Sequence, residues 1–174
     1  MGIEIYAFNT VRQQVAGSSL PKNVEVIDNV DIDALSWDTS TCYVGLKCEH
    51  SLAFGFRRFT RFLGFLSALD SEFSLSLAVL FPSSDGVISH ESCVDAYFNQ
   101  ILPIIDDIQS FRTRAYAYYY PENDFDEGDE YLANISCSET RELITYFANR
   151  KSDFNDFLHL LQFATQQSGF IGYG

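Results

Sequence analysis

A long apolar helix is predicted over residues 52–69, LAFGFRRFTRFLGFLSAL, with Ser51 as its N-cap. Its large side chains recur at the i, i+4, i+7 spacing of one helical face and then spread to the flanks, so little of the helix is expected to meet water. The opposite side is mostly small and lets another backbone come close. The pattern therefore predicts a central helix covered on more than one side. Its large apolar residues are Leu52, Phe56, Phe59, Phe62, Leu63, Phe65, Leu66 and Leu69.

Three arginines, Arg57, Arg58 and Arg61, interrupt this apolar helix. Basic side chains next to phenylalanine rings can hold a phosphate or a carboxylate. In this chain, however, acidic residues outnumber basic ones 24 to 11, and such arginines more often pair with acids of their own protein. We therefore expect an internal ion pair, with the aspartates of residues 28–38 as partners.

The remaining patterns alternate between strands and helices, and they predict an α+β or mixed α/β fold. We expect a single domain, residues 1–174, in which a small β-sheet packs against about four helices, with the helix near 52–69 at the centre. The apolar tail 170–174 is expected to add to the sheet or to pack in a groove. Strands are predicted at 3–8, 24–27, 41–46, 114–120 and 131–135, and at 73–81 with a short helix as the alternative; further helices begin at Ser89, with a break at Pro103, at Ser136 or Ser138, and at Ser152.

The net charge of −13 limits the partners of this chain. A phosphate backbone or an anionic membrane surface would be repelled, whereas a basic partner would be attracted. No apolar run reaches the roughly 18 residues that span a bilayer, and no signal peptide is visible at the start. We therefore expect a cytoplasmic protein that contacts neither nucleic acid nor membrane directly. Acidity for solubility alone is the simpler alternative.

More than half of the excess negative charge falls in residues 121–174, whose net charge is −7. The tyrosine-rich strand predicted at 114–120 comes just before this acidic segment. Tyrosines supply rigid contact area, and neighbouring carboxylates attract a cationic partner. A solvent-facing hairpin is the alternative. The predicted partner-binding residues are Tyr116, Tyr118, Tyr120, Asp124, Asp126, Glu127, Asp129 and Glu130.

Two Cys/His pairs are the candidate metal ligands. Cys48 and His50 precede the helix at 52–69, and His90 and Cys93 open the next helix. If both helix starts lie at one end of the sheet, two thiolates and two imidazoles could meet around zinc. One thiol could instead act as a nucleophile with a histidine base. Separate, locally bonded residues are the alternative that we favour, and His159 is expected to be a packed residue with one polar tip.

No phosphate-binding loop, dinucleotide fingerprint or metalloprotease motif occurs in the sequence. We therefore expect a non-catalytic acidic binding protein without a cofactor, most simply an inhibitor or immunity protein that neutralises a basic toxin or enzyme. One alternative is a phage-type anti-defence protein that mimics nucleic acid. A second is a small Cys/His metal-binding protein or enzyme. The sequence makes no prediction of the oligomeric state.

Overall fold

The computed structural model describes residues 2–109 and 151–174 of the chain. The described residues contain the strands β1 (Gly2–Gln13), β2 (Val24–Val26), β3 (Tyr43–Lys47), β4 (Leu52–Gly55), β5 (Gly86–Ile88) and β6 (Phe170–Tyr173). These strands form one antiparallel sheet in the order β2-β3-β1-β6-β5, with β4 also paired to β1. The α-helices within these described residues are α1 (Asn29–Ala34), α2 (Phe56–Phe73), α3 (His90–Val94) and α7 (Lys151–Ala164).

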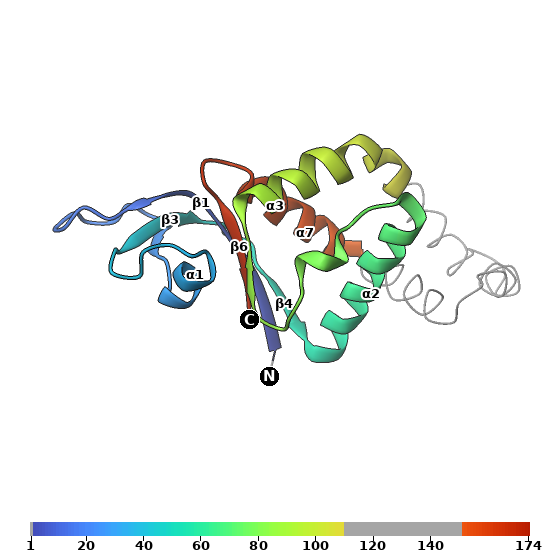
Figure 1. Cartoon of the computed structure of the whole chain (residues 1–174), viewed down its shortest axis with the longest axis horizontal. Coiled ribbons are helices and arrows are strands. Elements are labelled where there is room, and N and C mark those ends of the chain that lie inside the picture. The colour runs from blue at the N-terminus through green and yellow to red at the C-terminus, as the bar shows by residue number, and fades with distance from the viewer. Residues whose placement is uncertain (1, 110–150) are drawn as a thin grey trace, which may run out of the picture.

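Helices cover both faces of this sheet, so the predicted α+β class is confirmed. Figure 1 shows α1 on one side of the strands and α2, α3 and α7 on the other. The larger hydrophobic core lies on the side of α2, α3 and α7, and a smaller core lies under α1. The sheet therefore separates two layers of very different size.

The first strand, β1, lies at the centre of the sheet and contributes to both cores. Ile3, Ile5 and Ala7 belong to the large core, whereas Tyr6 and Phe8 belong to the small one. This alternation is the two-residue period of a strand with both faces covered. The strand predicted at the start of the chain is confirmed, and it runs five residues further than the pattern indicated.

The C-terminal segment forms β6, which lies between β1 and β5 and is buried along its length. The backbone N–H of Glu4 donates to the carbonyl of Gly174 at 2.9 Å, and the N–H of Gly174 donates back at 3.1 Å. Gly172 lies against the ring of Tyr6, where an added Cβ would come within 2.4 Å of the ring. The expectation that the tail adds to the sheet is confirmed.

The helix α2 begins at Phe56, four residues later than predicted. Residues 52–55 form β4 instead, with Leu52 and Phe54 pointing into the core and their backbone paired to β1. Apolar residues two and four positions apart fit a strand as well as a helix. This segment forms a strand because its backbone pairs with β1. The N-cap is Gly55, which offers no side chain to the first turn, so Ser51 is not the cap.

Only one face of α2 is buried, so the prediction of a helix enclosed on several sides is wrong. Phe56 is 67% exposed, and Arg57, Thr60 and Arg61 also face solvent. The helix is thus amphipathic and packs against the sheet along a single stripe. The buried stripe consists of Phe59, Phe62, Phe65, Leu66 and Leu69.

The strand predicted at 73–81 is also wrong. After α2 ends, Ser74 adopts a left-handed conformation, and a single 3-10 turn, η1 (Ala78–Leu80), follows. The carboxylate of Asp70 accepts the backbone N–H groups of Leu77 at 2.7 Å and of Ala78 at 2.8 Å. Because a side chain takes these donors, the segment has no need of a partner strand. Of the short helix predicted as the alternative, only this 3-10 turn is present.

The helix α3 begins where predicted, with Ser89 accepting the N–H of Ser92. It continues as a π-helix, η2 (Asp95–Ile101), and then as a 3-10 turn, η3 (Leu102–Ile104). Pro103 has no N–H to donate, and the last π bond runs from the N–H of Leu102 to the carbonyl of Tyr97. The predicted break at the proline is confirmed as a change of helix type.

The last predicted helix is confirmed as α7, with Phe154, Phe157 and Leu161 fully buried. The elements predicted at 114–120 and 131–135, and the helix predicted from Ser136 or Ser138, lie outside the described residues. Among the helices that the structure describes, none is both long enough and apolar enough to cross a membrane.

Candidate functional site

All eight residues predicted to bind the partner fall outside the part of the chain that the structure describes. Their role therefore stays a prediction. The described residues nevertheless contain a second acidic region, around the aspartates of 28–38. The predicted residues outside the structure are Tyr116, Tyr118, Tyr120, Asp124, Asp126, Glu127, Asp129 and Glu130.

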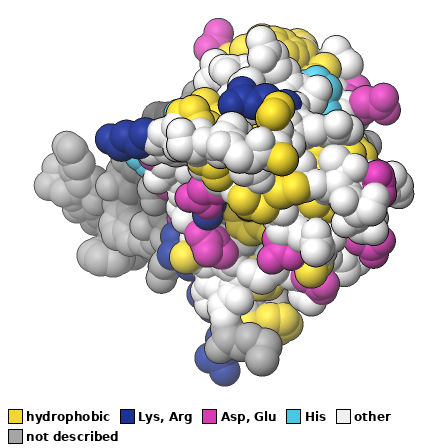
Figure 2. Space-filling view, turned by 90° about the vertical axis from the view of Figure 1, so that its left-hand side faces the viewer, with side chains coloured by type: hydrophobic (Ala, Val, Ile, Leu, Met, Phe, Trp, Pro, Cys, Tyr) yellow, Lys and Arg dark blue, Asp and Glu magenta, His cyan; other side chains and the backbone are white. Residues whose placement is uncertain are grey.

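The acidic region around α1 combines carboxylates with an exposed valine. We call Asp28, Val30 and Asp33 the α1 surface. All three are solvent-exposed, and the side chain of Val30 is 72% exposed. Figure 2 views the molecule from the α1 side and shows hydrophobic side chains bordered by acidic ones. An apolar centre with a charged border is the usual anatomy of a protein interface.

A partly buried hydrogen bond fixes α1 to the sheet. The hydroxyl of Tyr6 on β1 donates to the carboxylate of Asp31, with oxygen–oxygen distances of 3.1 and 2.9 Å. Ile32, the next residue of α1, is fully buried in the small core. Asp28 caps the helix by accepting the N–H of Val30 at 3.0 Å. The position of the α1 surface is therefore set by contacts with the first strand.

Burial raises the pKa of the Asp31 carboxyl above 3.8, with a further rise from Asp28, while the Tyr6 hydrogen bond opposes the shift. Burial and the neighbouring carboxylate also raise the pKa of the Tyr6 hydroxyl, so it stays protonated at neutral pH. The folded state thus binds the Asp31 proton more tightly than the unfolded chain does. Stability from this group is complete below pH 3.8 and is lost as the pH rises through the raised pKa.

We therefore expect Asp31→Asn to be more stable than the wild type at pH 7, because the amide oxygen can still accept the Tyr6 hydroxyl and no charge is buried. The advantage should shrink as the pH falls toward 4, where the wild-type carboxyl becomes protonated. Urea unfolding of both proteins at pH 7 and at acidic pH measures this difference. A difference that is independent of pH would contradict the assignment.

The four predicted metal ligands do not come together. His90 lies beside the carbonyl of Ala164, with Nδ1 at 3.1 Å, and the thiol of Cys93 donates to the carbonyl of Ile88 at 3.6 Å. The Cys93 contact is local in the sequence, whereas His90 contacts the last residue of α7, 74 residues away. Burial raises the pKa of the Cys93 thiol to about 12, so it is protonated at neutral pH. This pair therefore belongs to the packing of α3.

The other pair, Cys48 and His50, lies beside His159, which is not one of the four predicted ligands. The sulfur of Cys48 is 3.8 Å from Nδ1 of His159, and the rings of His50 and His159 are perpendicular with centroids 5.2 Å apart. His159 was expected to be packed, but it is exposed. It lies 109 residues beyond His50, so no spacing rule could have joined them. Burial also raises the pKa of the Cys48 thiol.

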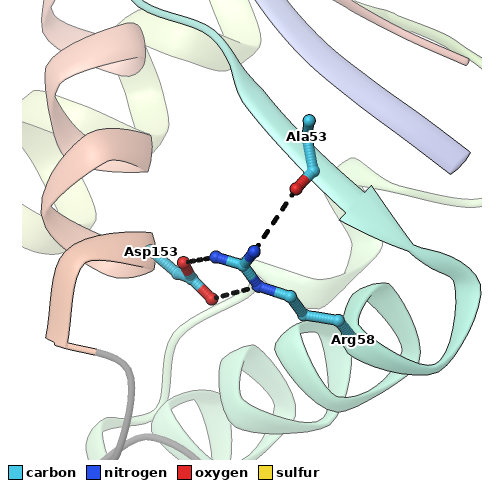
Figure 3. Close-up of polar contacts among 3 residues, drawn as sticks. All are labelled: Ala53, Arg58 and Asp153. Carbon is cyan, nitrogen blue, oxygen red and sulfur yellow. Dashed lines mark hydrogen bonds and ion pairs between the residues drawn. The ribbon is translucent and has the colours of Figure 1, made fainter.

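Arg58 forms the predicted internal ion pair, but with a different partner. Its guanidinium donates twice to Asp153 in the first turn of α7, from Nε at 3.1 Å and from Nη2, and once to the carbonyl of Ala53 at 3.5 Å (Figure 3). It also lies 5.0 Å from the ring centre of Phe54. The pairing with residues 28–38 is therefore wrong, because α1 is on the opposite side of the sheet.

Two hollows open near the Cys48–His159 contact. One, of about 360 Å³, lies between η2 and α7 and is lined by Ile101, Leu158 and His159 among others. The second, of about 280 Å³, has Cys48 in its wall. Within the described ranges, no three His, Cys, Asp or Glu side chains are already arranged to hold a metal ion. The other residues of the second hollow are Glu4, Asn23, Glu25, Lys47, Glu49 and Ser51.

Comparison of the chain with protein-family models, with characterised proteins and with solved structures gave no match in any of the three cases.

Proposed function

We propose that this protein is a non-catalytic cytoplasmic binding protein that engages a basic protein partner. In its sharpest form it is an inhibitor or immunity protein that neutralises a basic toxin or enzyme by direct contact. The observation that carries the proposal is the α1 surface, where the carboxylates of Asp28 and Asp33 flank the exposed Val30 in a chain of net charge −13.

The arrangement of the α1 surface favours a protein partner over a small ion. Val30 is the most exposed large apolar side chain of the helix, and Asp28 and Asp33 precede and follow it in the sequence. Apolar side chains at an interface centre supply the area that leaves water, while border charges steer the encounter and select the partner's sign. A partner with an apolar patch ringed by lysines or arginines would match both features.

The attachment of α1 to β1 supports the same function. The Tyr6–Asp31 bond and the burial of Ile32 hold the helix in one place before any partner arrives. A surface that is already ordered loses less conformational entropy when it binds. The predicted 116–130 surface would add to this contact or replace it, and the two can be separated by mutation.

The alternative is a nucleic-acid mimic, which would use the same carboxylates but would bind only enzymes that act on nucleic acid. An enzyme that binds DNA or RNA would then meet the carboxylates where it expects phosphates. A competition experiment separates this alternative from the first proposal. If the protein mimics nucleic acid, DNA or RNA should displace it from the enzyme. If it binds elsewhere on the partner, the protein and the nucleic acid should bind at the same time.

To test the proposal, the partner is first captured from a lysate of the native host with the immobilised full chain, and association rates are then measured. We expect Asp33→Lys to slow association roughly three- to tenfold at low salt and to flatten its salt dependence. Glu72→Lys is the matched control, since Glu72 is exposed on α2, away from the α1 surface. Equal rates for both variants would exclude the α1 surface as the steering element.

A combined charge reversal tests the second surface. It replaces Asp124, Asp126, Glu127 and Asp129 with lysine. Slower association would assign the steering role to this segment, and an unchanged rate would exclude it. If neither this variant nor Asp33→Lys affects binding, the proposal of an acidic protein that recognises a basic partner is wrong.

A further inference from the structure

The contact between Cys48 and His159 brings together two of the side chains that soft divalent metals prefer. Zinc binds cysteine sulfur at about 2.3 Å and histidine nitrogen at about 2.0 Å, so two such ligands of one tetrahedral ion lie about 3.6 Å apart. The observed distance from Sγ to Nδ1 is 3.8 Å. A shift of a few tenths of an ångström would let both atoms bind the same ion.

A third donor lies next to this pair. The ring of His50 is perpendicular to that of His159, with 5.2 Å between the ring centres, and both side chains are exposed. The described side chains do not yet form a closed set of three, and rotation of His50 about its side-chain bonds is the change that would close it. Because His50 is at the surface, this rotation displaces no core residue.

The backbone around Cys48 holds the sulfur in place. Burial raises the pKa of the Cys48 thiol, and a hydrogen bond from the amide N–H of His50 to the sulfur opposes part of this rise. Cys48 itself follows β3 and is bonded to the sheet through its own N–H and the carbonyl of Ala7, at 2.9 Å. One ligand is therefore held rigidly while the two imidazoles can adjust.

An acidic hollow adjoins the segment that carries Cys48 and His50. Glu4, Glu25 and Glu49 line it together with Cys48, and Lys47 is the one basic residue in its wall. Lys47 is already paired with Glu25, with nitrogen and oxygen 3.2 Å apart. The remaining carboxylates give this part of the surface a negative potential, which attracts divalent cations.

We propose that Cys48, His159 and His50 form a binding site for a zinc-type divalent ion, with water in the fourth position. The site is separate from the α1 surface and does not depend on the proposed inhibitor function. On binding, the Cys48 S–H bond breaks, a sulfur–metal bond forms and one proton is released to solvent, while the two neutral imidazoles each donate a nitrogen lone pair. No oxidation or reduction is involved.

Titration of the reduced full-length chain with Co²⁺ tests this site, because a thiolate–cobalt bond gives a charge-transfer absorption band. We expect the band to saturate at one equivalent, to disappear when Zn²⁺ is added, and to be accompanied by a higher melting temperature. His159→Gln should weaken binding at least about tenfold. This variant is decisive because His159 is exposed and its replacement leaves the core intact.

Two control variants separate this site from its alternatives. Cys42→Ser removes an exposed thiol that is bonded to Gln14, and His90→Gln removes a ligand of the set predicted from the sequence. Both should keep the wild-type band, whereas Cys48→Ser should lose it. The proposal is overturned if the wild type shows no band with excess Co²⁺, or if His159→Gln or Cys48→Ser binds Co²⁺ as the wild type does.

Discussion

Replacement of Arg58 with methionine is expected to lower the free energy of unfolding by about 3–5 kcal/mol. Asp153 is fully buried, and the guanidinium of Arg58 donates two parallel hydrogen bonds to its carboxylate. Removing the arginine takes these two bonds away from a carboxylate that is closed off from water. Such a change costs far more than the loss of an exposed ion pair, since water cannot replace the lost partner.

The two halves of this pair should respond unequally. Arg58 is 31% exposed, so after Asp153→Asn its charge can still reach water. We therefore expect a smaller loss of stability for Asp153→Asn than for Arg58→Met, and a partial recovery in the double variant Arg58→Met/Asp153→Leu. Urea denaturation with a constant m-value measures all three. If Arg58→Met were the least destabilised of them, the pair would contribute little to the fold.

The elements that the sequence predicted correctly are those with a local cause. The first strand alternates in sequence, Ser89 caps its helix with its own hydroxyl, and Pro103 removes a donor wherever it lies. The apolar tail had to be covered by something. In each case the physical reason is contained within a few residues of the chain, so no knowledge of distant partners was needed.

The errors arose where a distant segment decided the outcome. The local pattern of residues 52–55 fits a helix, but their backbone pairs with β1 and they form a strand. The local pattern after α2 fits a strand, but the carboxylate of Asp70 accepts the backbone N–H groups of that segment. Candidate sites show the same limit. Asp153 is 95 residues from Arg58, and His159 is 111 residues from Cys48. Composition predicted an ion pair and a Cys/His cluster, but only the fold could show which residues form them.

Phe62→Ala is expected to destabilise the protein by about 3–5 kcal/mol, the range for deleting a large buried aromatic side chain. Phe62 is fully buried on α2. Its ring stacks on Phe54 with centroids 5.2 Å apart and meets Phe157 of α7 edge-on at 5.4 Å. It therefore joins a strand and two helices, and the cavity left by alanine would be bounded by elements that cannot all close in.

Phe56→Ala on the same helix is the matched control for this result. Phe56 is 67% exposed, so its removal should change stability by no more than about 0.5 kcal/mol. The comparison is informative because the sequence pattern assigns both phenylalanines to the apolar face of one helix. Only the late start of α2, forced by β4, turns Phe56 outward. Equal losses for the two variants, measured by urea denaturation, would mean that the helix is buried on both sides after all.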